Sequence, residues 1–219
     1  DRQYATDAAS RTRLVLDNLQ KSVSTTALDY AWWDDAYEQL HLAFSPDWAQ
    51  STFSQSTVLG TEKEVDGVLV VGADDRLLFG TWRGEPVDPA VSASLAASAA
   101  QIAAKARGKI ADPSKGPQPH SGYLIHDGTV ALAGAVAVTP YEKPELAANS
   151  SGQTVLIMLR SLTPDYLSIV GKIYGIANLR VAPGSMPDAA PLVADLSAVG
   201  QSTETASPAL QVAQATANG

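Results

Sequence analysis

The chain has 219 residues, of which 45% are hydrophobic, enough for one large domain with a packed core. It carries 15 Lys and Arg against 23 Asp and Glu, and the formal net charge of −8 argues against binding nucleic acid, which requires clustered basic residues. With no cysteine, the sequence excludes thiolate metal sites, iron–sulfur clusters, cysteine nucleophiles and disulfides. No cofactor or metal is implied.

A helical period of three and four residues runs through the first 40 residues and predicts one long helix over residues 1–42. Its apolar stripe consists of Val15, Leu19, Val23, Ala27, Tyr30, Trp33, Tyr37 and Leu40. The polar first turns would project from the core. Ser45 and Pro46 have the residue types of an N-cap and a first helical position, so they predict a second, short helix that carries Trp48.

The period then changes to that of strands. Strands are predicted at residues 65–72, 76–82, 121–126, 129–138 and 153–162, with a sixth candidate at 177–181; helices are predicted at 86–108 and 163–174. Asp127-Gly128 has the sequence of a two-residue hairpin turn. Hairpins imply an antiparallel sheet that the helices must cover. The fold class is therefore α+β: a PAS-like antiparallel sheet of five to six strands with a long N-terminal helix and covering helices.

The composition changes after Pro183. No Lys or Arg follows Arg180, and residues 183–219 are rich in Ala, Ser, Thr, Gln and Pro. We interpret residues 1–182 as the folded domain and residues 183–219 as a flexible or poorly packed C-terminal segment, in which residues 192–196 could form one short strand.

The segment DYAWWDDAYEQL (residues 29–40), together with the later PDWA, the strand pair VLVVGADDRLLFG and the strand TVLIMLRSLTPDYL, resembles the type-four CHASE domain. The resemblance covers about residues 14–181 and is strongest at Trp33, Asp34, Asp35 and Tyr37. It implies a sensory, non-enzymatic domain on the periplasmic or extracellular face of the cytoplasmic membrane. The whole protein would be membrane-anchored, homodimeric and a signalling enzyme: a diguanylate cyclase, a cyclic-di-GMP phosphodiesterase or a histidine kinase. Because the chain begins at Asp1 rather than at Met, we expect it to be a fragment of such a receptor.

Bulky aromatic residues and two carboxylates meet in this segment. A buried carboxylate needs hydrogen-bond donors or a cation. Asp34 or Asp35 could cap the following helix or hold a loop, or could receive an amine or cation beside the rings of Trp33 and Tyr37. A shared helix face of Asp34, Glu38 and His41 could bind a metal, but a solvated face explains this spacing more simply.

The predicted hairpin places Tyr123 and Leu132 on one face of the sheet and a row of alanines on the other. The alanine face either packs tightly against a helix or leaves room for a ligand. Arg160 interrupts an apolar strand, so it could grip a carboxylate through its bidentate fork, or could pair with Asp34 or Asp35.

No catalytic motif is present. The sequence predicts instead that an unidentified small molecule binds to Trp33, Asp34, Asp35, Tyr37, Tyr123 and Arg160 and shifts the N-terminal helix. The alternative is a protein-interaction or dimerisation module without a small-molecule pocket.

Overall fold

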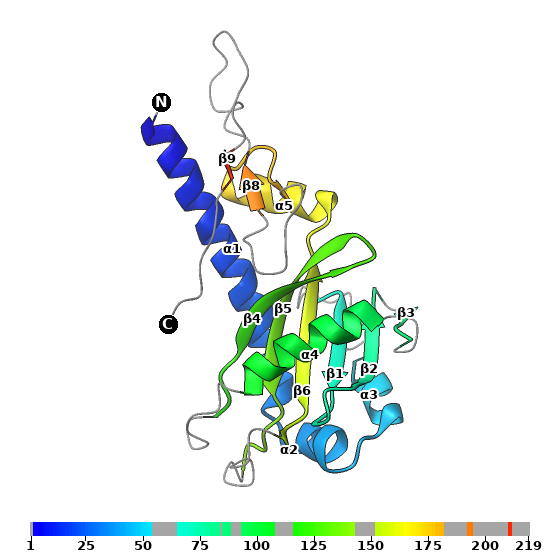
Figure 1. The fold of residues 1–219 in the computed structure, drawn as a ribbon. Coiled ribbons are helices and arrows are strands. Elements are labelled where there is room, and N and C mark those ends of the chain that lie inside the picture. The colour runs from blue at the N-terminus through cyan, green and yellow to red at the C-terminus, as the bar shows by residue number, and fades with distance from the viewer. Residues whose placement is uncertain are drawn as a thin grey trace.

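An antiparallel sheet with a helix on each face forms the centre of the computed structural model (Figure 1). The structure describes residues 2–53, 65–83, 85–88, 93–107, 116–142, 152–181, 192–194 and 210–211. The helices are α1 (Arg2–Ala31), α2 (Asp34–Ala36), the π-helix η1 (Tyr37–Leu42), α3 (Pro46–Thr52), α4 (Ala93–Arg107) and α5 (Pro164–Tyr174).

The strands within these residues form two sheets. The large sheet has the order β3-β2-β1-β6-β5-β4, and a small one has the order β7-β8-β9. Their bounds are β1 Gly67–Val71, β2 Leu77–Trp82, β3 Glu85–Pro86, β4 His120–His126, β5 Thr129–Ala137, β6 Val155–Ser161, β7 Arg180–Val181, β8 Leu192–Ala194 and β9 Leu210–Gln211. The expected α+β, PAS-like class is confirmed. Pro86 belongs to strand β3 rather than to the helix expected from residue 86.

The β4–β5 hairpin has the register that its turn predicts. His126 pairs with Thr129 and Tyr123 pairs with Leu132. Asp127 and Gly128 both have positive φ angles, 48° and 71°, as a type I′ turn requires.

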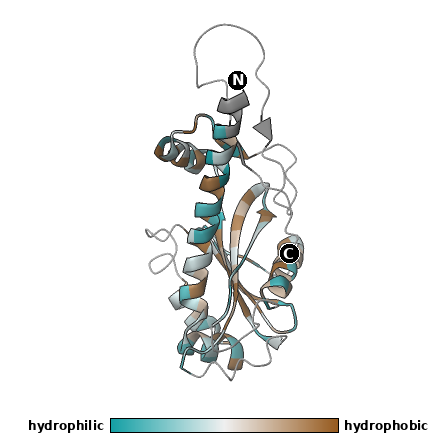
Figure 2. Ribbon diagram, turned by 90° about the vertical axis from the view of Figure 1, so that its left-hand side faces the viewer, coloured by the Kyte–Doolittle hydropathy of each residue, from teal (hydrophilic) through white to brown (hydrophobic). Residues whose placement is uncertain are grey.

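Each face of the large sheet carries its own core. Val68, Leu132, Val136, Leu156 and Met158 pack under α1, and the alanine face packs under α4. Figure 2 shows these layers edge-on, with the mostly hydrophobic strands between the two helices. Of the two possibilities for the alanine face, tight helix packing is confirmed. A sheet covered on both sides requires uninterrupted apolar strands, which explains the runs VLVV in β1 and VLIML in β6.

The helix expected over residues 1–42 is interrupted, and this corrects the prediction. α1 ends at Ala31, and Trp33 has extended backbone angles (φ −150°, ψ 135°) before α2 begins. The reason is a competing hydrogen-bond partner: Trp32 forms a parallel bridge with Thr139, whose N–H donates to the carbonyl of Ala31 at 2.9 Å. The end of β5 thus replaces the next helical turn.

α1 touches the sheet backbone to backbone at Gly134. A Cβ built on Gly134 would lie 2.6 Å from Cα of Ser24 and 2.9 Å from the carbonyl carbon of Val23. Only glycine allows this approach, because any side chain there would push α1 off the sheet.

α1 continues past the large sheet, where α5 and the small sheet lie beside it (Figure 1). Within residues 183–219, the described strands are β8 and β9, and β8 confirms the short strand expected there. The rest of that predicted segment lies outside the described residues. Among the described helices, none combines the length and the apolar character needed to cross a membrane.

Candidate functional site

Residues 32–42, which we call the junction, connect α1 to the turn before α3 and contain four of the six predicted site residues. Trp33 is 39% exposed, and its ring packs against Trp48 with centroids 5.6 Å apart. Tyr37 is buried against the ring of His41, 5.0 Å away. Ser45 caps α3 as predicted, by accepting a hydrogen bond from the backbone N–H of Trp48 at 3.3 Å.

The two neighbouring carboxylates of the junction have different environments. Asp34 Oδ1 accepts hydrogen bonds from the backbone N–H groups of Tyr141 and Glu142, at 2.8 and 3.2 Å, whereas Asp35 is exposed. Asp34 therefore holds the loop that follows β5, which is one of the two roles expected for it. This loop also carries Thr139, so it is attached to the junction at two points.

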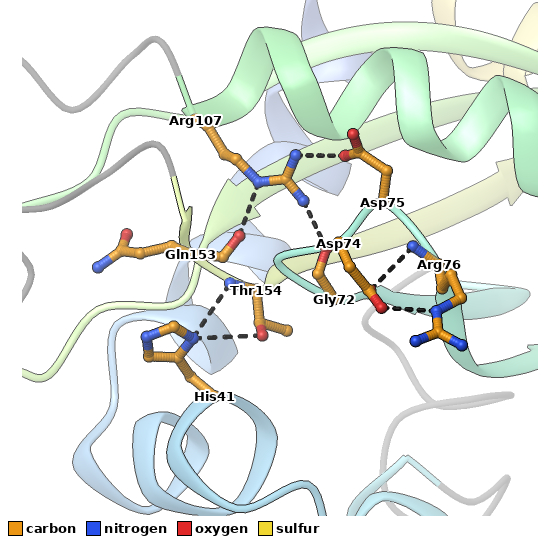
Figure 3. A network of polar contacts seen from close by, with 8 residues as sticks. All are labelled: His41, Gly72, Asp74, Asp75, Arg76, Arg107, Gln153 and Thr154. Carbon is orange, nitrogen blue, oxygen red and sulfur yellow. Dashed lines mark hydrogen bonds and ion pairs between the residues drawn. The ribbon is translucent and has the colours of Figure 1, made fainter.

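His41 fastens the π-helix to the start of β6 (Figure 3). Its Nδ1 lies 3.3 Å from both the backbone N and the hydroxyl oxygen of Thr154. Because Nδ1 accepts the backbone hydrogen bond, the ring is neutral, and burial lowers the pKa of His41 below its ordinary value. Single π-helical turns occur frequently at functional sites. The described residues contain no cluster of three or more metal-binding side chains, and Asp34 and His41 have the protein partners given above.

Arg107 is a central residue of this end of the sheet that the sequence reasoning missed. It is 7% exposed and donates from Nε to the carbonyl of Gln153 and from Nη2 to the carbonyl of Gly72, both at 2.7 Å (Figure 3). Its Nη1 forms an ion pair with Asp75 in the β1–β2 turn. The only signal in the sequence was a basic residue in the last turn of a helix, a pattern that usually reflects the helix dipole.

Tyr123 and Arg160 lie elsewhere, on the face of the sheet that α1 covers. They flank Leu132, which pairs with Tyr123 on one side and with Arg160 on the other. The hydroxyl of Tyr123 accepts a hydrogen bond from Gln20 at 2.7 Å. Burial, and secondarily the charge of Asp17, raise the pKa of Tyr123, so it stays protonated.

Arg160 pairs with neither Asp34 nor Asp35, contrary to one of the two alternatives. Its Nη1 lies 3.4 Å from Asp66, and its guanidinium lies 3.9 Å above the ring of Tyr166. Asp66 also accepts the backbone N–H of Ser161. The cause is strand order: β1 is the neighbour of β6, so the residue before β1 faces Arg160.

The six predicted residues thus fall into two groups. Tyr123 and Arg160 both pair with Leu132 in β5, whereas the junction is bridged to Thr139, further along the same chain segment. Seven residues of extended chain separate these two positions, which is about 23 Å. One small molecule does not span both groups.

Several buried polar atoms have no hydrogen-bond partner within the described part of the chain. Near the junction they are Nε1 of Trp32 and both amide atoms of Gln153; elsewhere they are the Thr81 and Ser161 hydroxyls and Nε of Arg160. These atoms cannot be recognised from the sequence, because the surroundings of each depend on contacts between distant segments.

Comparison with known proteins gives one family and one solved structure of interest. The family model of the CHASE4 domain matches residues 15–181. No curated protein matches the chain. The crystal structure of the periplasmic domain of Vibrio cholerae LuxQ shares 16% sequence identity, with 92% of this chain and 81% of that chain covered and a TM-score of 0.46.

Proposed function

The chain belongs to the CHASE4 domain family, and from this premise we propose that it binds a small molecule and transmits the bound state through α1. The domain is an extracytoplasmic sensor, located on the periplasmic or extracellular face of the cytoplasmic membrane. Small-molecule binding and the movement of α1 are the parts that we propose.

The observation that carries the proposal is the way α1 ends. The carbonyl of Ala31 in the last turn of α1 accepts its hydrogen bond from the backbone N–H of Thr139, two residues after the end of β5. Asp34, three residues later, holds the loop after Thr139. A change in the spacing between this loop and the sheet therefore acts directly on the last turn of α1, because the loop is hydrogen-bonded to that turn and to Asp34.

The mechanism is a population shift between two arrangements of the junction. A ligand changes the balance only to the extent that it binds one arrangement more tightly than the other. Helices in receptors and oligomers typically shift by about 1–2 Å in such transitions. Trp33, Asp34, Asp35 and Tyr37 are the predicted ligand contacts that belong to this region.

Arg160 offers a second place for a ligand. Its Nε atom is buried without a partner, and its contact with Asp66 is long, at 3.4 Å. A carboxylate could use the unfilled part of the guanidinium fork. Binding there would act on the face under α1 rather than on the junction.

The proposal is tested in two steps on the purified chain. Amino acids, organic acids, amines and nucleosides are screened for an increase in Tm, and each hit is repeated with Trp33→Ala and Arg160→Gln, which assign it to the junction or to the second place. The chain has no cysteine, so Arg13→Cys and Asp127→Cys, both at exposed positions, can carry a unique pair of spin labels. A hit should shift the α1-to-hairpin distance by about 1–2 Å.

The competing function is an interaction or dimerisation module without a ligand. A broad screen without a stabilising compound, together with a stable dimer in light scattering, would favour that module. We further propose that the full receptor is a homodimer whose output is a diguanylate cyclase, a cyclic-di-GMP phosphodiesterase or a histidine kinase. The sequence of the complete gene tests the output directly.

A further inference from the structure

We infer that Trp32, Thr139 and Gln153 form a binding site for a small neutral molecule that carries an amide-like group, with a hydrogen-bond donor and an acceptor side by side. This inference rests on the proposed sensory function and deepens it by naming a ligand chemistry.

The strand register brings the three residues together. Ala137 pairs with Val155, and the N–H of Val138 donates to the carbonyl of Thr154, so Thr139 lies opposite Gln153. On its other side, Thr139 forms the parallel bridge with Trp32. Bridge partners point to the same side of a sheet, and side chains alternate along each strand. All three side chains therefore leave the backbone toward the α4 side, because Ala137 and Val155 both belong to the core under α4.

The polar side-chain atoms of these residues are buried and have unused hydrogen-bonding capacity. Gln153 is 1% exposed, and neither its Oε1 nor its Nε2 has a partner within the described residues. The indole N–H of Trp32 is in the same state. Thr139 is fully buried and donates its hydroxyl proton to the carbonyl of Ala137 at 2.9 Å, so its oxygen keeps acceptor capacity. Native proteins rarely leave a whole buried amide unpartnered, so the group calls for a partner that is not part of the described chain.

The Trp32 ring is held in place rather than free to turn away. A Cβ on Gly116 would lie 2.8 Å from this ring, so the backbone of Gly116 packs directly on it. The ring of Tyr141 packs against it at a tilt of 57°, with centroids 5.1 Å apart. Because Asp34 binds the N–H of Tyr141, the site and the junction share this loop.

Charge and donor count define the ligand. Of the described residues, Arg107 is the cation that contacts Gln153, and it is already engaged by Asp75 and two carbonyl groups, one of which belongs to Gln153 itself. Among the described residues around Gln153, no charge is left unpaired to hold an ion, so we infer a neutral ligand. An amide group can pair with the Gln153 amide through two hydrogen bonds, and its carbonyl oxygen has a second lone pair for the indole N–H of Trp32.

The test uses acetamide as the probe and the whole chain uniformly labelled with ¹⁵N. The indole signal of Trp32, identified by its loss in Trp32→Phe, and the side-chain amide signal of Gln153 should shift saturably with acetamide. N,N-dimethylacetamide, which cannot donate, should bind at least about tenfold more weakly, since one hydrogen bond to a buried group is lost. Gln153→Met, of similar length, should abolish the indole shift, and Gln101→Met on the exposed face of α4 should leave it unchanged.

Absence of a saturable shift, or an unchanged indole response in Gln153→Met, would overturn the site. Detection of bound water alone beside Trp32 and Gln153 would also overturn it, because water would then be the missing partner. If Gln153→Met does not fold, Trp32→Phe, which replaces the indole with a smaller aromatic ring that has no N–H donor, should weaken acetamide binding at the Gln153 signal. The site and the proposed function fail separately. Acetamide binding without a change in the spin-label distance refutes the signalling step and leaves the site standing. A distance change caused by a compound from the screen, while acetamide gives no saturable shift, refutes the site and leaves the proposed function standing.

Discussion

The contact between α1 and Gly134 gives the most direct prediction for stability. In Gly134→Ala, the added methyl group would meet three backbone atoms of α1 at 2.6 to 2.9 Å, the Cα and N of Ser24 and the carbonyl carbon of Val23. Real Cβ contacts do not come this close, so helix and sheet must move apart by about half an ångström or more. Overpacking of this kind costs about 1–3 kcal/mol, and the upper half applies because backbone cannot rotate away.

The expected loss is therefore about 2–3 kcal/mol in the free energy of unfolding. For a chain of this size, it corresponds to a Tm lower by about 4–12 °C. Urea unfolding followed by circular dichroism measures the free energy, and calorimetry measures Tm. The matched control is Gly122→Ala in the neighbouring strand, where the nearest atoms, in the Ile102 side chain, lie 3.7 Å from the new Cβ. A Gly134→Ala protein within about 0.5 kcal/mol of the parent, or an equal loss in Gly122→Ala, would refute the reasoning.

Three further predictions concern the end of the sheet near the junction. Burial lowers the pKa of His41 in the folded state below its ordinary value of 6.5. As the pH falls below 6.5, the unfolded state gains the proton first, so the contribution of His41 to stability, complete above pH 6.5, is lost. Thermal melts across this range should show the decline in Tm, and His41→Gln should flatten it. Arg107→Met should lower the free energy of unfolding by about 2–3 kcal/mol because it removes two hydrogen bonds from a charged group to buried carbonyls, although the Gly72 carbonyl keeps the N–H of Asp75 as a partner. Asp75→Ala should cost less than half as much in the same urea titration, since Asp75 is largely exposed. Asp34→Ala should cost about 1 kcal/mol and speed amide exchange in the loop after β5, and Asp35→Ala, its exposed neighbour, should change neither quantity measurably.

The hairpin and the two faces of the sheet could be predicted from the sequence because their determinants are local. Asp127-Gly128 sets the turn, the turn sets the register, and alternation then assigns Tyr123 and Leu132 to one face. The same logic identified the alanine face, because small side chains are what a closely packed helix needs.

Partners across the sheet could not be predicted, because strand order was not known. Asp66 and Arg160 are 94 residues apart, and they meet only because β1 lies beside β6. Arg107 likewise depends on where α4 ends relative to the β1–β2 turn. Polar residues at the ends of strands and helices can be recognised from the sequence as candidates for ion pairs and hydrogen bonds, but their partners can be identified only when the strand order is known.

The break at Trp32 was missed for a different reason. The apolar period continues through residues 32–42 because both α1 and the π-helix bury one side, so periodicity alone does not reveal the interruption. What decides the local structure is a hydrogen bond from Thr139, more than 100 residues away in the sequence. Such a bond makes the end of α1 dependent on β5, which local helix propensity cannot register.

The same two contacts predict how α1 moves. At Gly134, the helix has no room to approach the sheet, so that contact acts as a pivot, and the junction acts on the helix end at Ala31. With a rise of 1.5 Å per residue, Ala31 lies about 10 Å beyond Ser24, whereas Arg13 and Asp7 lie about 16 and 26 Å on the other side. A tilt that moves Ala31 by 1 Å therefore moves Arg13 by about 1.6 Å and Asp7 by about 2.5 Å. Spin labels at Arg13→Cys and Asp7→Cys, each paired with Asp127→Cys, should show a ligand-dependent distance change that grows toward the N-terminus. Equal changes at both positions would mean that α1 slides along its axis, and the pivot at Gly134 would then be wrong.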